Sequence, residues 1–392
     1  MKENENSKEV NDKTGKREEK KKVKKTGKKS GKKSGRLRGF LIGLGIFLAI
    51  VGIVAVWYTN HMHYDIESHE FYDVETLKAE GRSYDKSSVV YMTSDISPEG
   101  LDKVYQALNV TPSGKVAIKL STGEAGNPNY LDPNLIKNLV QSVDGTIIEC
   151  NTAYSGSKRA ETEMHMQVAK DHGFTEIADV DIMDRDGYMK IPVEGGVNLQ
   201  ENWVGKNLAN YDYVIVLTHF KGHPMGGFGG ALKNISIGIA SSEGKTRIHT
   251  GGVFSNPPID FGSMVTNQDV FTESMAEAAK SVSDYEGNGQ NIVYISVMNN
   301  MSIDCDCVSS PTEVDMHDIG ILASTDPVAL DQACIDLVFR AKDGQSLQNR
   351  ILEKNGLHIL THAEEIGFGT RAYEIVNVDE VGDDLEVNSD EN

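Results

Sequence analysis

Five short apolar runs constrain the fold of this chain more than any other feature of its sequence. They are rich in β-branched residues and span Val116–Leu120, Thr146–Cys150, Tyr213–Thr218, Ile292–Val297 and Ile319–Ala323. Amphipathic stretches separate them, and four of these stretches predict helices over residues 133–143, 160–172, 267–282 and 327–339. Near-continuous apolar strands that alternate with helices are typical of parallel strands buried on both faces. The sequence therefore predicts an α/β fold with a mostly parallel sheet and helices on both faces.

Charge divides the 392 residues into two unlike parts. Residues 1–38 contain 16 Lys or Arg and 6 Asp or Glu, whereas the remainder contains 23 and 52. The basic part is predicted to be a disordered cytoplasmic tail that contacts anionic membrane lipid, and a contact with nucleic acid or a partner is the alternative. The acidic remainder repels phosphate backbones, so we expect no nucleic-acid partner. Residues 376–392 are predicted to form an acidic tail.

Residues 39–59 are predicted to form a single N-terminal transmembrane helix. Phe40–Tyr58 are 19 residues without a charge, which as a helix would span about 28 Å of a bilayer core of about 30 Å. The Lys/Arg excess precedes this run, so the positive-inside rule predicts a cytoplasmic N-terminus and an extracytoplasmic main domain at the cell membrane. A buried core helix and a cleaved signal peptide are the alternatives. Residues 60–87 are predicted to be a spacer before an α/β domain at 88–375.

Polar and glycine-rich residues follow each of the five predicted strands. STGEAGNPNY follows the first strand, NTAYSG the second, THFKGHPMGGFGG the third, MNNMSIDCDC the fourth and STDP the fifth. Ligands of open parallel sheets bind beyond the carboxyl ends of the strands. The sequence therefore predicts a site for a small-molecule ligand at that edge.

The segment from His219 to His249 is the densest of these loops in chemically useful residues. It carries His223, Lys233 and four closely spaced glycines, Gly226, Gly227, Gly229 and Gly230. Glycines let a backbone approach a ligand closely, but the segment lacks the Gly-Lys-Ser/Thr ending of a phosphate loop. The lysine is suited to pair with or attack a carboxylate or carbonyl group, and the histidines to move protons or bind metal. A tight turn with surface histidines is the alternative.

Cys305 and Cys307 form a compact cluster with Asp304 and Asp306. Two cysteines one residue apart on an extended loop point to opposite sides, so a metal site would need ligands from other loops. Metal or cluster ligation, a thiol redox or disulfide role, and a structural role are all open for the pair. The other two cysteines lie in a predicted strand and a predicted helix, which favours burial.

Several motifs resemble the domain of unknown function 362 family, whose members are often labelled uncharacterised iron–sulfur-centre proteins. They are KLSTGEAGNPNYLDP, IECNTAYSGSKRAET, IDCDCVSS, DIGILASTDPVALDQACIDLV and the segment NYDYVIVLTHFKGHPMGGFGGALKNISIGIASSEGKTRIH. The resemblance covers roughly residues 88–375. It implies a metal ion or iron–sulfur cluster near Cys305 and Cys307, although this chain lacks the ferredoxin-like insert of many relatives.

Residues 219–249 are similar, more remotely, to the nickel-pincer lactate racemases. In that family a histidine precedes a glycine-rich turn, a lysine then tethers the cofactor, and a later histidine binds nickel. The resemblance implies that His223 transfers a proton, that Lys233 holds a nickel-type cofactor, and that His249 binds the metal. It places Gly227, Gly229 and Gly230 around the cofactor. A His-Arg pair follows the first strand of the racemases, and Glu124 takes that place here as the candidate second base.

Together these features predict a membrane-anchored extracytoplasmic protein with a metal or iron–sulfur site at the strand ends. We expect a redox or isomerase-type enzyme that acts on a small organic acid. The alternative is a non-catalytic surface protein that binds metal or small carboxylates. A purely structural surface protein is the least consistent with such chemically loaded loops.

Overall fold

The computed structural model describes residues 41–45, 47–49, 66–260 and 262–379. The predicted basic tail, most of the predicted anchor and nearly all of the acidic tail lie outside these residues. The described residues of the anchor, 41–45 and 47–49, are helical, but at 1.5 Å per residue they would span only about 12 Å of a bilayer core of about 30 Å. Within the described residues, no helix has both the length and the apolar character that crossing a membrane requires. This finding overturns the predicted transmembrane helix and the predicted single-pass location with an extracytoplasmic main domain.

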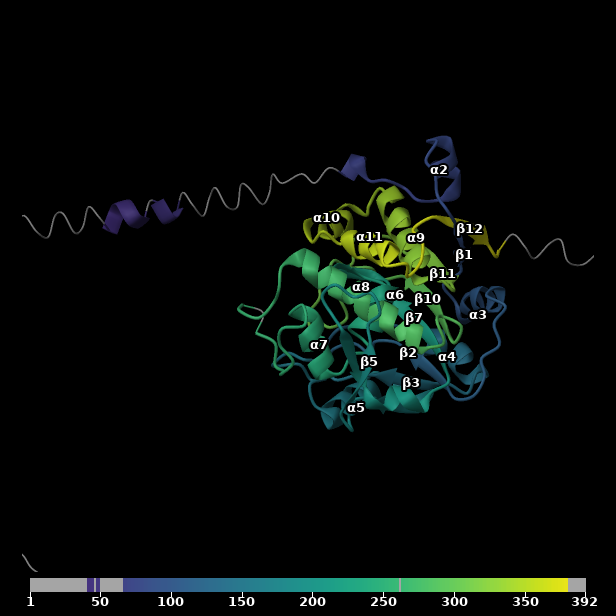
Figure 1. The fold of residues 1–392 in the computed structure, drawn as a ribbon, viewed down its shortest axis with the longest axis horizontal. Coiled ribbons are helices and arrows are strands. Elements are labelled where there is room, and N and C mark those ends of the chain that lie inside the picture. Colours follow the sequence, from purple (N-terminus) through teal and green to yellow (C-terminus); the bar gives the residue numbers. More distant parts are fainter. Residues whose placement is uncertain (1–40, 46, 50–65, 261, 380–392) are drawn as a thin grey trace, which may run out of the picture. The chain divides into compact units, whose positions relative to one another are not determined.

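One eight-stranded sheet forms the centre of the described domain, in the order β12-β1-β11-β10-β7-β2-β3-β4 (Figure 1). Its strands are β1 (Ser88–Thr93), β2 (Val116–Lys119), β3 (Thr146–Glu149), β4 (Val180–Ile182), β7 (Tyr213–His219), β10 (Ile292–Met298), β11 (Gly320–Ser324) and β12 (Tyr373–Asn377). The five strands from β10 to β4 run parallel, as do β1 and β12. The predicted α/β fold with a mostly parallel sheet is confirmed.

All five apolar runs form strands, but β11 runs opposite to its neighbours. Its register pairs Met298 with Gly320 and Tyr294 with Ser324. The carboxyl end of β11 therefore lies at the edge away from the other four strand ends. There Asp326 accepts hydrogen bonds from Val328 N at 2.9 Å and Ala329 N at 3.2 Å, which caps the next helix. The expectation of five converging strand ends thus holds for four.

Helices cover both faces of the sheet. The first group of helices packs on one face: α3 (Pro98–Ala107) and α4 (Pro133–Ser142). The second group packs on the other face: α6 (Ala231–Ser236), α8 (Gln268–Tyr285), α9 (Pro327–Arg340), α10 (Gln345–Glu353) and α11 (His358–Glu365). Strand residues alternate between the two cores: Val214 and Val216 pack with the second group, while Ile215 and Leu217 pack with the first. This period of two follows from the pleat of a strand. Residues that cap the helices include Asp132 before α4 and Asn267 before α8.

Smaller elements extend the sheet edge that carries the site. They are α5 (Thr162–Asp171), α7 (Ser242–His249), and two hairpins, β5 (Tyr188–Pro192) with β6 (Glu201–Gly205) and β8 (Lys221–His223) with β9 (Gly227–Gly229). The β8–β9 hairpin follows directly after β7. It therefore presents the glycine-rich segment beyond the carboxyl end of a central strand.

Part of the predicted spacer, residues 60–87, is described from residue 66 and packs against α9. His69 Nε2 lies 2.9 Å from Asp336 Oδ1, and Tyr72 N donates to Asp336 Oδ2 at 2.8 Å. Arg340 pairs with Asp73, the N-cap of α2 (Val74–Ala79), at 2.6 Å. Since Asp336 is fully buried, these contacts join the segment to the core of the domain.

Candidate active site

A cavity of about 510 Å³ lies at the carboxyl ends of the parallel strands. Its walls come from segments that follow four of them: Ser121 after β2, Thr152 after β3, His223 after β7 and Cys307 after β10. Segments far apart in the chain meet there because parallel strands all end at the same edge. This is the edge at which the sequence predicts a ligand site.

Five cationic side chains line this cavity: Lys119, Arg159, Lys221, Lys233 and Lys245. Only two carboxylates, those of Glu149 and Asp306, stand among the lining residues. The chain as a whole has a net charge of −19, so the basic cavity has the opposite sign to the chain's net charge. A concave site lined by one sign of charge attracts ligands of the other sign.

Three of the four cavity lysines are already engaged by hydrogen bonds. Lys119 Nζ donates to Leu120 O at 2.6 Å, and Lys221 Nζ donates to His219 O at 2.6 Å. Lys245 Nζ donates to Ala240 O at 2.6 Å. Lys221 also pairs with Asp306 at 2.9 Å. Burial would raise the pKa of Asp306, but this cation and His219 hold it well below its usual range.

Lys233 differs from the other three cavity lysines in its contacts. Its Nζ makes no hydrogen bond or ion pair with any other described residue. Burial, with Lys221 nearby, lowers the pKa of Lys233 to about 7. Close to neutral pH the residue therefore holds a substantial fraction of unprotonated amine, which is the nucleophilic form.

The glycines of the segment have different surroundings. A Cβ on Gly227 would lie 3.0 Å from Gly356 Cα, so this glycine allows packing against the end of α10. Gly229 and Gly230 line the cavity. A Cβ on Gly230 would lie 2.3 Å from Asp331 Oδ1 of α9. Asp331 accepts hydrogen bonds from the first main-chain N–H groups of α6, the helix that carries Lys233, at 2.7 and 3.0 Å.

The main chain holds His223 in one tautomer. Its Nδ1 accepts hydrogen bonds from Met225 N at 3.2 Å and Gly226 N at 2.8 Å. In neutral imidazole one ring nitrogen accepts and the other carries the proton, so Nε2 of His223 is the donor. Burial, with Lys233 nearby, keeps the pKa of His223 well below its ordinary value. The ring is therefore a neutral hydrogen-bond donor.

His249, on α7, is held in the opposite tautomer. Its Nδ1 donates to Lys245 O at 2.7 Å, which leaves Nε2 as the acceptor atom. Burial lowers the pKa of His249 to about 4, and its ring stacks on Phe271 with centroids 4.9 Å apart. An imidazole with an acceptor Nε2 and an Nδ1–H bound to a carbonyl is the form that binds metals or accepts protons.

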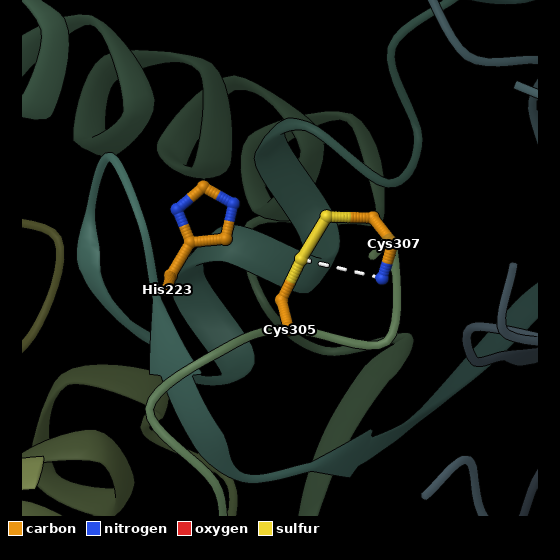
Figure 2. A group of neighbouring side chains, drawn as sticks. All are labelled: His223, Cys305 and Cys307. Carbon is orange, nitrogen blue, oxygen red and sulfur yellow. Dashed lines mark hydrogen bonds between the residues drawn. A yellow bond between two sulfur atoms is a disulfide. The ribbon is translucent and has the colours of Figure 1, made fainter. Parts of the chain in front are cut away.

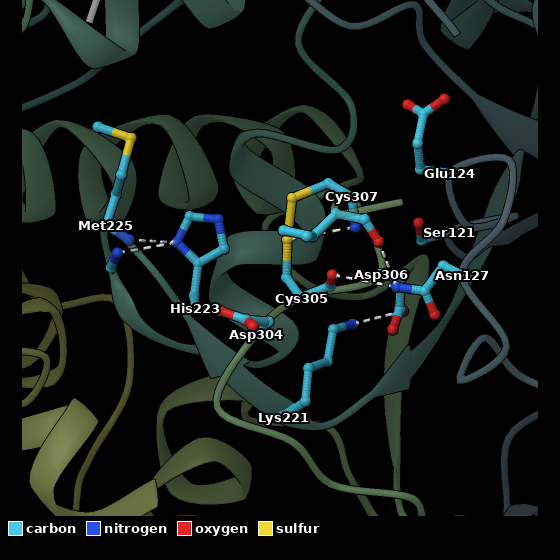
Figure 3. Close-up of a disulfide and its surroundings, with 12 residues drawn as sticks. Ser121, Glu124, Asn127, Lys221, His223, Met225, Asp304, Cys305, Asp306 and Cys307 are labelled. Atoms are coloured by element: carbon cyan, nitrogen blue, oxygen red, sulfur yellow. Dashed lines mark hydrogen bonds and ion pairs between the residues drawn. A yellow bond between two sulfur atoms is a disulfide. The ribbon is translucent and has the colours of Figure 1, made fainter. Parts of the chain in front are cut away.

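Cys305 and Cys307 are joined in a disulfide on the loop after β10 (Figure 2). One ring nitrogen of His223 and the two sulfurs lie within 4.8 Å of one another. The structure thus brings the cysteine pair together with His223, and His249 is not part of this group. Figure 3 shows the disulfide between His223 on one side and Asn127 with Ser121 on the other.

These donors do not fit the four-cysteine ligation of an iron–sulfur cluster. Cys150 and Cys334, the remaining cysteines of the chain, are both buried as free thiols, and burial raises the pKa of each. A mononuclear site of His223 with a reduced cysteine pair meets another obstacle. The ring would have to give up its two main-chain hydrogen bonds before Nε2 could bind a cation.

Glu124, the candidate second base, is held by the loop after β3. Its Oε2 accepts from Ser157 Oγ at 2.5 Å and its Oε1 from Lys158 N at 2.7 Å. Its carboxylate also lies 3.7 Å from Arg159 Nε. The cavity lining does not include Glu124. A proton-transfer role for it remains a prediction.

Three residues of the cavity were not predicted from the sequence: Arg159, Lys119 and Lys245. Lys119 had a visible signal, because a lysine inside the otherwise apolar run VAIKL needs a buried partner or a ligand. Arg159 lies in SGSKRAET, one of the motifs that carry the family resemblance. Lys245 gave no signal beyond its place in an amphipathic helix.

An α/β protein with a basic cavity at the carboxyl edge of its sheet is the class that fold and site define. The chain belongs to the family described as Domain of unknown function (DUF362), whose profile matches residues 116–336, more than half of the chain. The family resemblance seen in the sequence is therefore confirmed. No curated protein matches the sequence.

Two solved structures show weak similarity to this chain. The lactate racemase apoprotein from Thermoanaerobacterium thermosaccharolyticum is 18% identical with a TM-score of 0.37, and the match covers 63% of this chain and 56% of that one. A protein from Thermotoga maritima is 14% identical with a TM-score of 0.36, covering 60% and 57%. This chain thus spans little more than half the length of either. The remote similarity to a lactate racemase is found at this low level.

Proposed function

We propose that this protein is an enzyme that acts on a small organic acid bound in the cavity, by redox or isomerase-type chemistry. The observation that carries the proposal is the gathering of five basic side chains in one cavity of an acidic chain. A cavity of about 510 Å³ is within the usual size of small-molecule sites. The acid's carboxylate would offset the repulsion among the cations.

Two buried polar atoms in the cavity support an anionic ligand. Thr152 Oγ1 and Arg159 Nε have no hydrogen-bond partner among the described residues, and both residues line the cavity. Buried polar groups without a partner are costly, at about 1–3 kcal/mol each. Both atoms are shielded from the cavity in this structure, so each side chain would have to turn toward a bound carboxylate, and the hydrogen bonds formed would remove this cost.

Lys233, His249 and His223 would each have a separate role in the reaction. The Lys233 amine would pair with the acid or attack its carbonyl carbon, and Nε2 of His249 would accept a proton or bind a metal. Nε2–H of His223 would donate a hydrogen bond to an oxygen of the substrate. A metal-containing cofactor held by Lys233 and His249 would supply Lewis-acid or redox chemistry when bound.

Trapping of a carbonyl acid on Lys233 tests this proposal. We expect pyruvate and cyanoborohydride to give one adduct on Lys233 by mass spectrometry. Its yield should rise between about pH 6 and 8, because the unprotonated fraction of the amine increases through its pKa of about 7. Lys233→Met should abolish the adduct, whereas Lys137→Met, at an exposed position of α4, should not. Adducts spread over many lysines would contradict the proposal.

A non-catalytic protein that binds small carboxylates is the alternative, since a basic cavity serves binding as well as chemistry. Incubation with lactate or malate in deuterated water separates the two. Loss of the Cα–H signal by NMR indicates proton transfer and supports an enzyme. Thermal stabilisation by these acids without exchange favours the binding protein.

A further inference from the structure

The Cys305–Cys307 disulfide contributes little to holding the chain together. It closes a loop with only Asp306 between its ends. The chain entropy that a disulfide removes from the unfolded state grows with loop length, so a loop this short gains the least. Both sulfur-bearing residues line the cavity. A disulfide that adds little stability and borders a ligand cavity is suited to a chemical role.

Hydrogen bonds hold this loop independently of the sulfurs. Glu124 N donates to Asp306 O at 2.7 Å, and Tyr154 Oη donates to Cys307 O at 3.1 Å. The Asp306 carboxylate is anchored by His219 at 2.8 Å. It is also anchored by Lys221 at 2.9 Å (Figure 3). The two sulfurs would therefore stay adjacent after reduction, ready to form the bond again.

We infer that Cys305 and Cys307 form a thiol–disulfide redox centre that oxidises a small thiol compound bound in the cavity. The inference goes beyond the proposed function, because it assigns to the disulfide a reaction that the lysine and the two histidines do not perform. The two other cysteines are free and buried. Cys150 borders the same cavity but is only 4% exposed, and burial raises the pKa of its thiol, so it is a poor nucleophile. The pair is thus the redox couple that the described part of the chain offers to a ligand.

The two sulfurs have different surroundings, which assigns them different roles. Cys305 is only 2% exposed, whereas Cys307 is partly exposed. Cys307 N donates a hydrogen bond to Cys305 Sγ at 3.3 Å. His223, with its proton on Nε2, lies within 4.8 Å of both sulfurs (Figure 2). N–H donors stabilise a thiolate, so Cys305 is the sulfur that leaves and Cys307 is the sulfur that is attacked.

The reaction balances with a dithiol as the reductant. One substrate thiolate attacks Cys307 Sγ, which breaks the Cys305–Cys307 bond and releases the Cys305 thiolate. The second substrate thiol then attacks the substrate sulfur of this mixed disulfide and releases the Cys307 thiolate. The dithiol loses two electrons and two protons and becomes a cyclic disulfide. The cysteine pair gains the two electrons and the two protons, and solvent relays the protons.

The preferred dithiol carries a carboxylate, a refinement that rests on the proposed function. The cations that line the cavity would attract such a compound and hold its charged end away from the sulfurs. A charged cavity can raise the rate of association about 10- to 1,000-fold. The neutral amide of the same dithiol has identical sulfur chemistry and lacks this attraction.

Mixing the oxidised full-length chain with dihydrolipoate or with dihydrolipoamide tests both parts. We expect one equivalent of either dithiol to be oxidised, with dihydrolipoate reacting at least about tenfold faster at low salt. Thiol titration should then find two reactive thiols in the native protein and two more only after unfolding. Cys334→Ala, a change remote from the loop, should leave the rate unchanged.

Single variants of the pair test the assignment of roles. With glutathione disulfide, Cys305→Ser should form a stable mixed disulfide on Cys307 and release one glutathione thiolate. Cys307→Ser should react more slowly because Cys305 is shielded. His223→Phe should slow reduction about tenfold or more, the effect of one hydrogen bond to a charged sulfur, while the number of reactive thiols stays at two.

Three outcomes would overturn these inferences. Failure of both dithiols to reduce the native disulfide would overturn the redox centre. So would zinc, iron or nickel retained by the reduced full-length chain and lost from the Cys305→Ser, Cys307→Ser double variant. Equal rates with the charged and neutral dithiols would overturn the carboxylate preference and weaken the proposed function, while the redox centre would stand.

Discussion

Two histidines in one cavity acquire opposite chemistry from their main-chain partners. Nδ1 of His223 accepts from two N–H groups, whereas Nδ1 of His249 donates to a carbonyl. The first ring therefore offers a proton donor to the cavity and the second an acceptor. The sequence resemblance implies proton transfer by His223 and metal binding by His249. The geometry supports hydrogen-bond donation by His223 and is compatible with either role for His249.

Glu124 illustrates how a residue suited to catalysis can instead hold a loop. Its carboxylate accepts from Ser157 Oγ and Lys158 N. We expect Glu124→Gln to lower the free energy of unfolding by about 1–3 kcal/mol, because two hydrogen bonds to a buried charge are weakened. Urea denaturation measures the change. Glu161→Gln, at an exposed position without a capping hydrogen bond, is the control and should have no effect. Lost turnover at unchanged stability would instead identify Glu124 as the second base.

At the scale of elements, the contact between α6 and α9 positions Lys233. Asp331 on α9 accepts from the first N–H groups of α6, and Gly230 lies directly against its carboxylate. The helix has only six residues, which is too short to be stable without such tertiary contacts. The place of Lys233 in the cavity therefore depends on α9, which comes about 100 residues later in the chain.

Gly230→Ala tests this dependence. The added Cβ would lie 2.3 Å from Asp331 Oδ1, so α6 must shift, and overpacking of this kind costs about 1–3 kcal/mol. We expect a lower melting temperature and a weaker pyruvate adduct on Lys233. Gly229→Ala is the matched control for the melting temperature, because its Cβ would meet no atom closer than 3.5 Å. Equal behaviour of the two variants would show that α6 does not need this contact.

At the scale of the whole molecule, the segment before β1 belongs to the domain's packing. Asp336 is fully buried and accepts from Tyr72 N and Tyr373 Oη, with His69 Nε2 at 2.9 Å. Two of these partners come from the segment predicted as a spacer. Without them, a buried carboxylate on α9 would lose much of its hydrogen bonding.

Two truncations measure this contribution. Removal of residues 1–63 should leave the unfolding midpoint of the α/β domain in urea unchanged. Removal of residues 1–86 should lower the free energy of unfolding by at least about 2 kcal/mol, because His69 and Tyr72 N are lost from Asp336. Equal stability of the two truncated chains would show that residues 66–86 are a spacer that does not stabilise the domain.

Local patterning was sufficient for most of the elements. The apolar runs became β2, β3, β7, β10 and β11, and the four predicted helices became α4, α5, α8 and α9, with ends shifted by at most three residues. Period and capping are properties of neighbouring residues, so a sequence carries them directly. The edge strands β12 and β4 and the inner strand β1 were not predicted, because none of them stands out as a long apolar run.

Long-range contacts decided the direction of β11 and the chemistry of the cavity. The direction of a strand depends on which neighbours it pairs with, and β11 pairs with β1 and β10 from opposite parts of the chain. The residues of the cavity, from Lys119 to Cys307, are likewise brought together by strand order. The sequence by itself predicted His223, Lys233 and the cysteine pair as candidate site residues, and the structure places all of them at one cavity. Burial, tautomer and the pKa of the lysine come from surroundings that exist only once the sheet has assembled.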